Sequence, residues 1–78
     1  MRLLISNLNR KTTTSQVASL LGTFGLISSA MVMMNVKSGY SEGVALVEIE
    51  YKAGQMAISE LNNTRFMNYY INVEETKR

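Results

Sequence analysis

Residues 43–51 read GVALVEIEY, and this short stretch decides the fold. Its apolar side chains recur at every second position, which is the pattern of a strand with one buried face. The odd positions that form the buried side are Ala45, Val47 and Ile49. Glu48 and Glu50 mark the even side as the solvent face, because unpaired charges are almost never buried. Val44 and Leu46 share that side, so the sequence predicts two exposed apolar residues on one strand.

Three other apolar stretches predict strands, and two amphipathic stretches predict helices. The expected strands are residues 2–8, 26–36 and 70–74, and the expected helices are residues 13–24 and 52–62. Leu3 and Ile5 are expected to point inward on the first strand, as are Ile71 and Val73 on the last. On the second strand the expected inward positions are Ala30, Val32 and Met34, and the outward ones are Ser29, Met31 and Met33.

The first helix carries clear signals at both ends. Thr13 stands three residues before Gln16, a spacing in which each side chain satisfies a backbone N–H of the other residue. The apolar stripe that follows consists of Val17, Leu20, Leu21 and Phe24. Gly25 comes just after the stripe and is expected to be a left-handed cap. The second helix is expected to stop at Asn62-Asn63, and residues 66–69 are expected to form a tight turn.

The elements follow one another in the order βαββαβ, which predicts an α+β fold. Two helices can cover only one face of a four-stranded sheet, so the other face is expected to stay open. The 78 residues have room for one core, and we expect a single domain over residues 1–75. Residues 76–78 are polar and are expected to form a frayed tail.

The composition argues against an enzyme. The chain has no His, no Cys and no Asp, which removes the usual general base, thiol nucleophiles and most metal ligands. Its carboxylates are all Glu, and neither Glu48 with Glu50 nor Glu74 with Glu75 has a second catalytic group nearby. We therefore expect no catalysis, no metal, no cofactor and no small-molecule substrate.

Charge and hydropathy leave the partner open. The net charge is +2 and the pI is about 9.2, which permits a polyanionic partner, but the cations are scattered and form no stripe. The apolar start at residues 3–5 is too short for a signal peptide or a membrane span. The sequence therefore predicts a cytoplasmic protein with no membrane partner.

Two short stretches resemble the signature motifs of the RNA recognition motif family. Residues 3–8, LLISNL, match the family's hexamer, and residues 42–49, EGVALVEI, match its octamer. The resemblance covers nearly the whole chain and is strongest to short, single-domain bacterial members. It implies a ferredoxin-like sandwich whose antiparallel sheet has the order 4-1-3-2, with both helices on one face. It also implies that single-stranded RNA binds the open face.

The match is weaker at the positions that contact RNA in the family. The resemblance assigns base stacking to Leu4, Val44 and Leu46, where the family usually has aromatic rings. The basic residue that opens the octamer is replaced by Glu42, which would repel a nearby phosphate. The chain is therefore identified as a member with degenerate RNA-binding motifs.

One hypothesis is weak binding of single-stranded RNA on the open face without the usual rings. Stacking would come from Tyr70 and from Tyr40 in a loop, and Ser6 and Asn72 would meet base edges. The expected phosphate contacts are Arg2, Lys37, Lys77 and Arg78. The expected face as a whole consists of Arg2, Leu4, Ser6, Met31, Met33, Val44, Leu46, Glu48, Tyr70 and Asn72.

The alternative hypothesis is a protein-interaction or homodimerisation module that uses the same face. An aliphatic, Met-rich surface adapts well to a partner helix or to a second copy of itself. A contiguous apolar patch of this kind marks an interaction site. Glu48 would then lie at the rim, and the two hypotheses are compatible if a dimer binds RNA.

Overall fold

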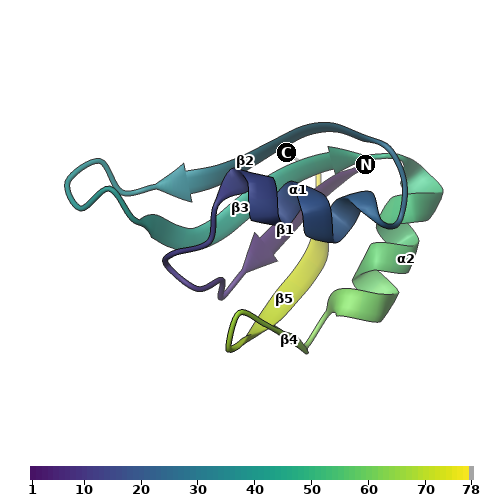
Figure 1. Ribbon diagram of the computed structural model, residues 1–78. Coiled ribbons are helices and arrows are strands. Elements are labelled where there is room, and N and C mark those ends of the chain that lie inside the picture. Colours follow the sequence, from purple (N-terminus) through teal and green to yellow (C-terminus); the bar gives the residue numbers. More distant parts are fainter. Residues whose placement is uncertain (78) are drawn as a thin grey trace.

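A computed structural model describes residues 1–77 of the chain, which form two helices and five strands (Figure 1). The elements are β1 (Arg2–Ser6), α1 (Thr14–Gly22), β2 (Ile27–Met34), β3 (Ser41–Ile49), α2 (Tyr51–Leu61), β4 (Thr64–Phe66) and β5 (Tyr69–Thr76). No helix within these residues is long and apolar enough to cross a membrane.

The strands form one antiparallel sheet in the order β2-β3-β1-β5-β4. The expected sheet of four strands in the order 4-1-3-2 is therefore wrong, because β4 adds a fifth strand at one edge. The four expected strands keep their neighbours, with β5 in the place of the expected fourth strand. The chain thus has the βαββαβ plan with an extra edge strand.

A two-residue turn produces this extra strand. Met67 and Asn68 have φ angles of 49° and 72°, the left-handed backbone that a tight hairpin connection requires. The turn expected at residues 66–69 is present, and it folds β4 back onto β5.

The last strand is also longer than the expected 70–74. Pairing with Arg2 carries β5 to Thr76, so this residue belongs to the sheet and not to a frayed tail. Of the remaining expected tail, Arg78 lies outside the described residues.

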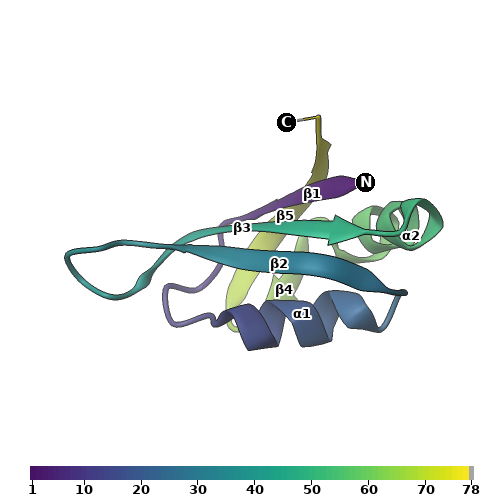
Figure 2. The same cartoon turned by 90° about the horizontal axis from the view of Figure 1, so that it is seen from above.

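The core lies between the sheet and the two helices. Inward residues of β1, β3 and β5 are fully or almost fully buried, while outward residues of the same strands keep solvent contact. Figure 2 shows α1 beneath the sheet, and neither of the two helices within residues 1–77 lies over the opposite face. The buried residues include Leu3, Ile5, Ala45, Val47, Ile49, Ile71 and Val73, so the predicted inward positions of these strands are confirmed.

The start of α1 follows the prediction and its end does not. The Thr13 hydroxyl accepts a hydrogen bond from the Gln16 N–H, and the Gln16 side chain accepts one from the Thr13 N–H. The helix stops at Thr23 without a left-handed residue, and Gly25 has no positive φ. A Cβ on Gly25 would lie 2.6 Å from the Cβ of Ala53, so close contact with α2 is what requires glycine here.

Strand β2 is the least regular strand of the sheet. Its register against β3 shifts twice, once between Ile27 and Ser29 and again between Val32 and Met34. Val32 is buried and Met31 is 54% exposed, as the alternation predicts. Met34 was expected to point inward but is 51% exposed, because the second shift breaks the alternation between Val32 and Met34.

Candidate nucleic-acid interface

The centre of the open face is a row of side chains that crosses four strands. Met31 pairs with Leu46, Leu46 pairs with Leu4, and Leu4 pairs with Glu74. Directly opposite residues of antiparallel strands point to the same face, with their Cβ atoms about 5 Å apart. Leu4 and Leu46 are half-buried by these neighbours. The centre is therefore a continuous aliphatic surface with a carboxylate at its β5 end.

Next to this row, the face becomes polar towards β5. Ser6 pairs with Asn72. Tyr70 lies two residues before Asn72, on the same side of β5. The Asn7 Nδ2 donates a hydrogen bond to the Tyr70 carbonyl oxygen over 2.8 Å, which fixes this part of β5 against the end of β1. Tyr70 itself is 64% exposed, so its ring is available to solvent.

The opposite end of the face carries a pair of opposite charges. Arg2 pairs with Glu48 across β1 and β3, and their side chains form an ion pair. The sequence predicted both residues on this face but did not predict that they contact each other. Glu74 also points outward, as the alternation after Tyr70 and Asn72 requires, although it was left out of the predicted face. Two carboxylates therefore flank the aliphatic centre.

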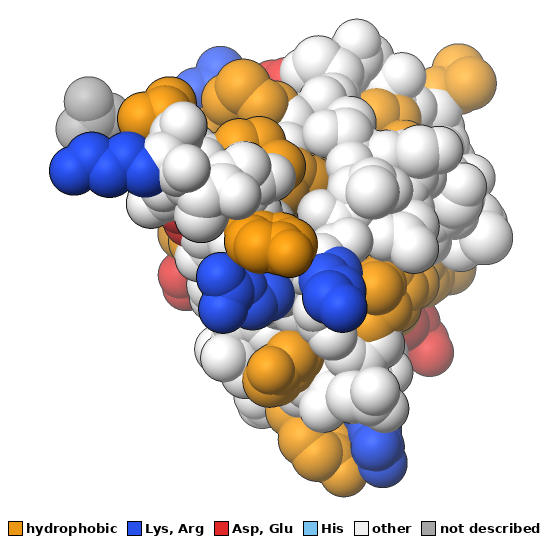
Figure 3. Space-filling model, turned by 60° about the vertical axis from the view of Figure 1, so that its left-hand side comes forward, with side chains coloured by type: hydrophobic (Ala, Val, Ile, Leu, Met, Phe, Trp, Pro, Cys, Tyr) orange, Lys and Arg blue, Asp and Glu red, His pale blue; other side chains and the backbone are white. Residues whose placement is uncertain are grey.

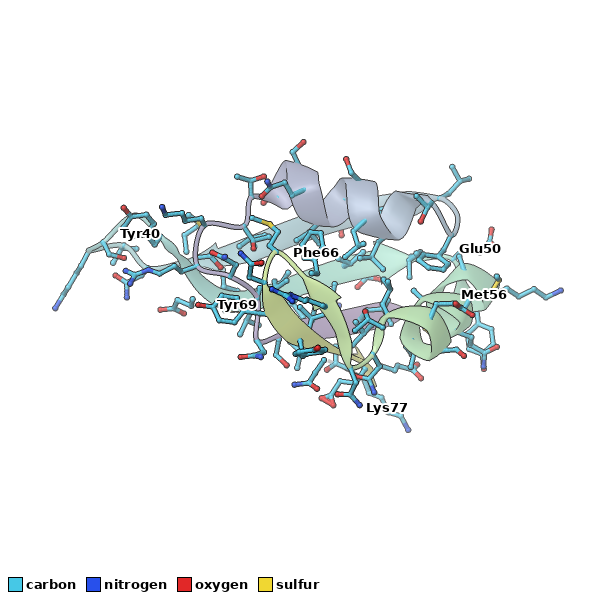
Figure 4. All side chains as sticks on the ribbon, turned by 60° about the horizontal axis from the view of Figure 1, so that its bottom comes forward. Tyr40, Glu50, Met56, Phe66, Tyr69 and Lys77 are labelled. Atoms are coloured by element: carbon cyan, nitrogen blue, oxygen red, sulfur yellow. The ribbon has the colours of Figure 1, made fainter. Side chains whose placement is uncertain are left out.

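The loop residues of the predicted site lie beyond the sheet. Lys37 and Tyr40 belong to the loop between β2 and β3, and Lys77 follows β5; Figure 4 shows Tyr40 and Lys77 far apart. The Arg10 guanidinium lies over the Tyr40 ring, 4.6 Å from its centre. Figure 3 brings the left-hand side of Figure 1 forward and shows Lys and Arg side chains beside hydrophobic ones there. Arg78, the other expected tail contact, lies outside the described residues.

Two further cations that lie beside predicted site residues were missed by the sequence analysis. Arg10 was assigned to a polar loop, and only the folded chain brings it to Tyr40. Arg65 pairs directly with Tyr70 across β4 and β5, so both side chains point to the open face. Without β4, the sequence does not indicate that Arg65 lies on the open face. The turn expected at residues 66–69 was the one feature that indicated a hairpin at this place.

Within the described residues, the acidic side chains form no group of three that could hold a metal ion.

Comparison with known proteins gives a consistent result. The family model of the RNA recognition motif matches residues 3–72. The chain is 30% identical over 73 residues to the RNA-binding protein Y14 of Arabidopsis thaliana, a match that covers 92% of this chain and 36% of that protein. The chain therefore spans about a third of the length of this curated relative.

Two solved structures are similar over almost the whole chain. The crystal structure of RNA-binding protein PG1 has a TM-score of 0.94 and 28% identity, covering 100% of this chain and 95% of that one. The RRM of Rna15, solved with bound RNA, has a TM-score of 0.90 and covers 99% of this chain and 83% of that one. Its 17% identity supports a common fold alone.

Proposed function

This chain belongs to the RNA recognition motif family, and from that premise we propose that it binds single-stranded RNA on the open face of its sheet. The observation that carries the proposal is the uncovered outer side of the sheet, whose strands β1 and β3 contain the family's two signature motifs. Two relatives at about 30% identity, PG1 and Y14, are named RNA-binding proteins. We infer the same ligand class for this chain.

The residues at the centre of the face support binding of RNA with low affinity. Leu4, Val44 and Leu46 occupy the positions at which a ring would stack on a base. Each lost stack costs about 1–3 kcal/mol of binding free energy. Aliphatic side chains still remove apolar base surface from water, but they distinguish poorly between bases. Binding at the centre is therefore weak and of low sequence preference.

The distribution of charge supports an RNA affinity that depends only weakly on salt concentration. Arg2 lies beside Glu48, and the other cations among the described residues lie in loops, on α2, at the edge strand β4 or after β5. Each phosphate neutralised on a single strand adds about 0.7 to the slope of log affinity against log salt. Few phosphates can be contacted from these positions, so the slope is expected to be small.

The decisive experiment is a titration of the protein with pooled random single-stranded RNA at low and high salt. Leu46→Glu places a charge in the middle of the open face and should weaken binding about tenfold or more. Met56→Glu is the matched control, because Met56 is an exposed methionine on α2. Absence of binding by the wild-type protein at low salt would refute the proposal.

A second candidate function uses the same surface. Met31 is 54% and Met33 41% exposed beside the aliphatic centre, and such an apolar surface suits association with a second copy of the chain. Light scattering after gel filtration tests this directly. A monomer at high protein concentration would contradict self-association and would leave RNA binding unaffected.

A further inference from the structure

The hairpin of β4 and β5 brings a cation and an exposed ring together at one edge of the open face. Arg65 lies directly opposite Tyr70 in the antiparallel pair, which places their Cβ atoms about 5 Å apart. Tyr70 is 64% exposed. Because Ile71 and Val73 on the same strand are buried, Tyr70 points away from the core.

The backbone under this pair is held from two sides. The hydrogen bond from Asn7 to the Tyr70 carbonyl oxygen joins β5 to the end of β1. On β4, Phe66 lies between the hairpin and α1 (Figure 4) and packs against the core. The Arg65 guanidinium donates a hydrogen bond to the Asn68 side-chain oxygen over 3.1 Å. The ring and the cation therefore project from a fixed backbone.

The charge around the pair favours a phosphate. Within residues 1–77 no carboxylate lies within ion-pair distance of Arg65. The outward carboxylate of β5 is Glu74, four residues from Tyr70, which is about 13 Å along the strand. Glu48 lies on β3, with β1 and β5 between it and β4. This edge of the face therefore combines a ring and a cation away from the face's carboxylates.

We infer that Arg65 and Tyr70 form the subsite that holds one nucleotide of the bound RNA. The base stacks on the Tyr70 ring, and the Arg65 guanidinium contacts the adjacent phosphate. Base stacking on the protein is thus displaced from the centre of the sheet to the β4–β5 edge. The inference rests on the proposed function, and it adds the position of the strongest single contact with RNA.

The two side chains make different contributions, so salt-dependent titration separates them. With a random single-stranded RNA pool, Tyr70→Leu should lower affinity about tenfold and leave the salt slope unchanged. Arg65→Gln should reduce the magnitude of the slope by about 0.7, the value for one lost phosphate contact on a single strand. Tyr69→Leu and Lys52→Gln are matched controls, because Tyr69 points to the other side of the hairpin and Lys52 lies on α2.

The outcomes distinguish this inference from the proposed function. If the wild-type protein binds RNA but neither Tyr70→Leu nor Arg65→Gln differs from its control, the subsite is wrong and the proposed function stands. If the wild-type protein binds no RNA, both fall. Circular dichroism of each variant establishes that it is folded. Expected changes in both variants, with unchanged controls, support the subsite.

Discussion

Leu4 lies directly opposite Leu46 in the β1–β3 pair, and both side chains point to the open face of the sheet. In the family, the corresponding positions usually carry rings that stack on bases. Two leucines keep the shape of the face and its apolar character but present no flat surface to a base. The fold of the family is thus retained, while leucines stand at two positions where the family usually has rings.

Restoring rings at the centre is expected to strengthen RNA binding. Val44→Phe combined with Leu46→Phe adds two stacking surfaces at half-buried positions of β3. At about 1–3 kcal/mol for each stack, affinity for random single-stranded RNA should rise at least tenfold in fluorescence anisotropy titrations. Met56→Phe, on the exposed surface of α2, controls for non-specific binding caused by an added ring. An unchanged affinity of the double variant would mean that RNA does not reach the centre of the face.

Removing the carboxylate of Glu48 is expected to strengthen binding with little effect on stability. Glu48 and Arg2 form a partly exposed ion pair, with side chains 35% and 43% exposed, and such pairs contribute at most about 1 kcal/mol. Glu48→Gln should therefore change the free energy of unfolding by less than that amount, measured in urea. The loss of repulsion should raise RNA affinity about twofold to fivefold at low salt.

The control for this variant is Glu60→Gln, because Glu60 is an exposed carboxylate on α2. It changes the net charge equally but lies away from the open face. Equal gains in affinity from both variants would show that net charge, and not the position of Glu48, governs binding.

Strands with strict alternation could be predicted almost completely from the sequence. In β3 the outward Glu48 determines which side faces solvent, and every other residue of the strand follows from it. The prediction failed where no such marker exists. Strand β4 has three residues, too few to show a period, and methionine-rich β2 does not reveal its register shifts.

The limits of the site prediction have the same physical origin. Leu4, Val44 and Leu46 follow from alternation within single strands. Arg65 requires knowledge of the β4–β5 pairing, and the contact of Arg10 with Tyr40 requires two loops to meet. Such contacts between distant parts of the chain leave no local pattern in the sequence.

Gly25 shows how a tertiary contact can resemble a local signal. Gly25→Ala should destabilise the protein by about 1–3 kcal/mol, because the new Cβ would lie 2.6 Å from the Cβ of Ala53 and force α2 to shift. Urea unfolding measures the effect. Gly22→Ala is the control: the nearest atom to its Cβ is 4.0 Å away, and alanine in a helix is favoured by about 0.5–1 kcal/mol. Equal effects of both substitutions would refute the packing explanation.

The salt dependence of the wild-type protein tests how its cations are used. If two or three phosphates are contacted, the slope of log affinity against log salt should lie between about −1.4 and −2.1 for single-stranded RNA. Titrations at four salt concentrations from about 50 to 200 mM are enough to measure it.

A slope steeper than about −4 would require six or more phosphates. The sheet face cannot supply that number, because Arg2 is held beside Glu48 and Arg65 lies alone at the far edge. Such a slope would instead place the RNA along the loops that carry Arg10 and Lys37.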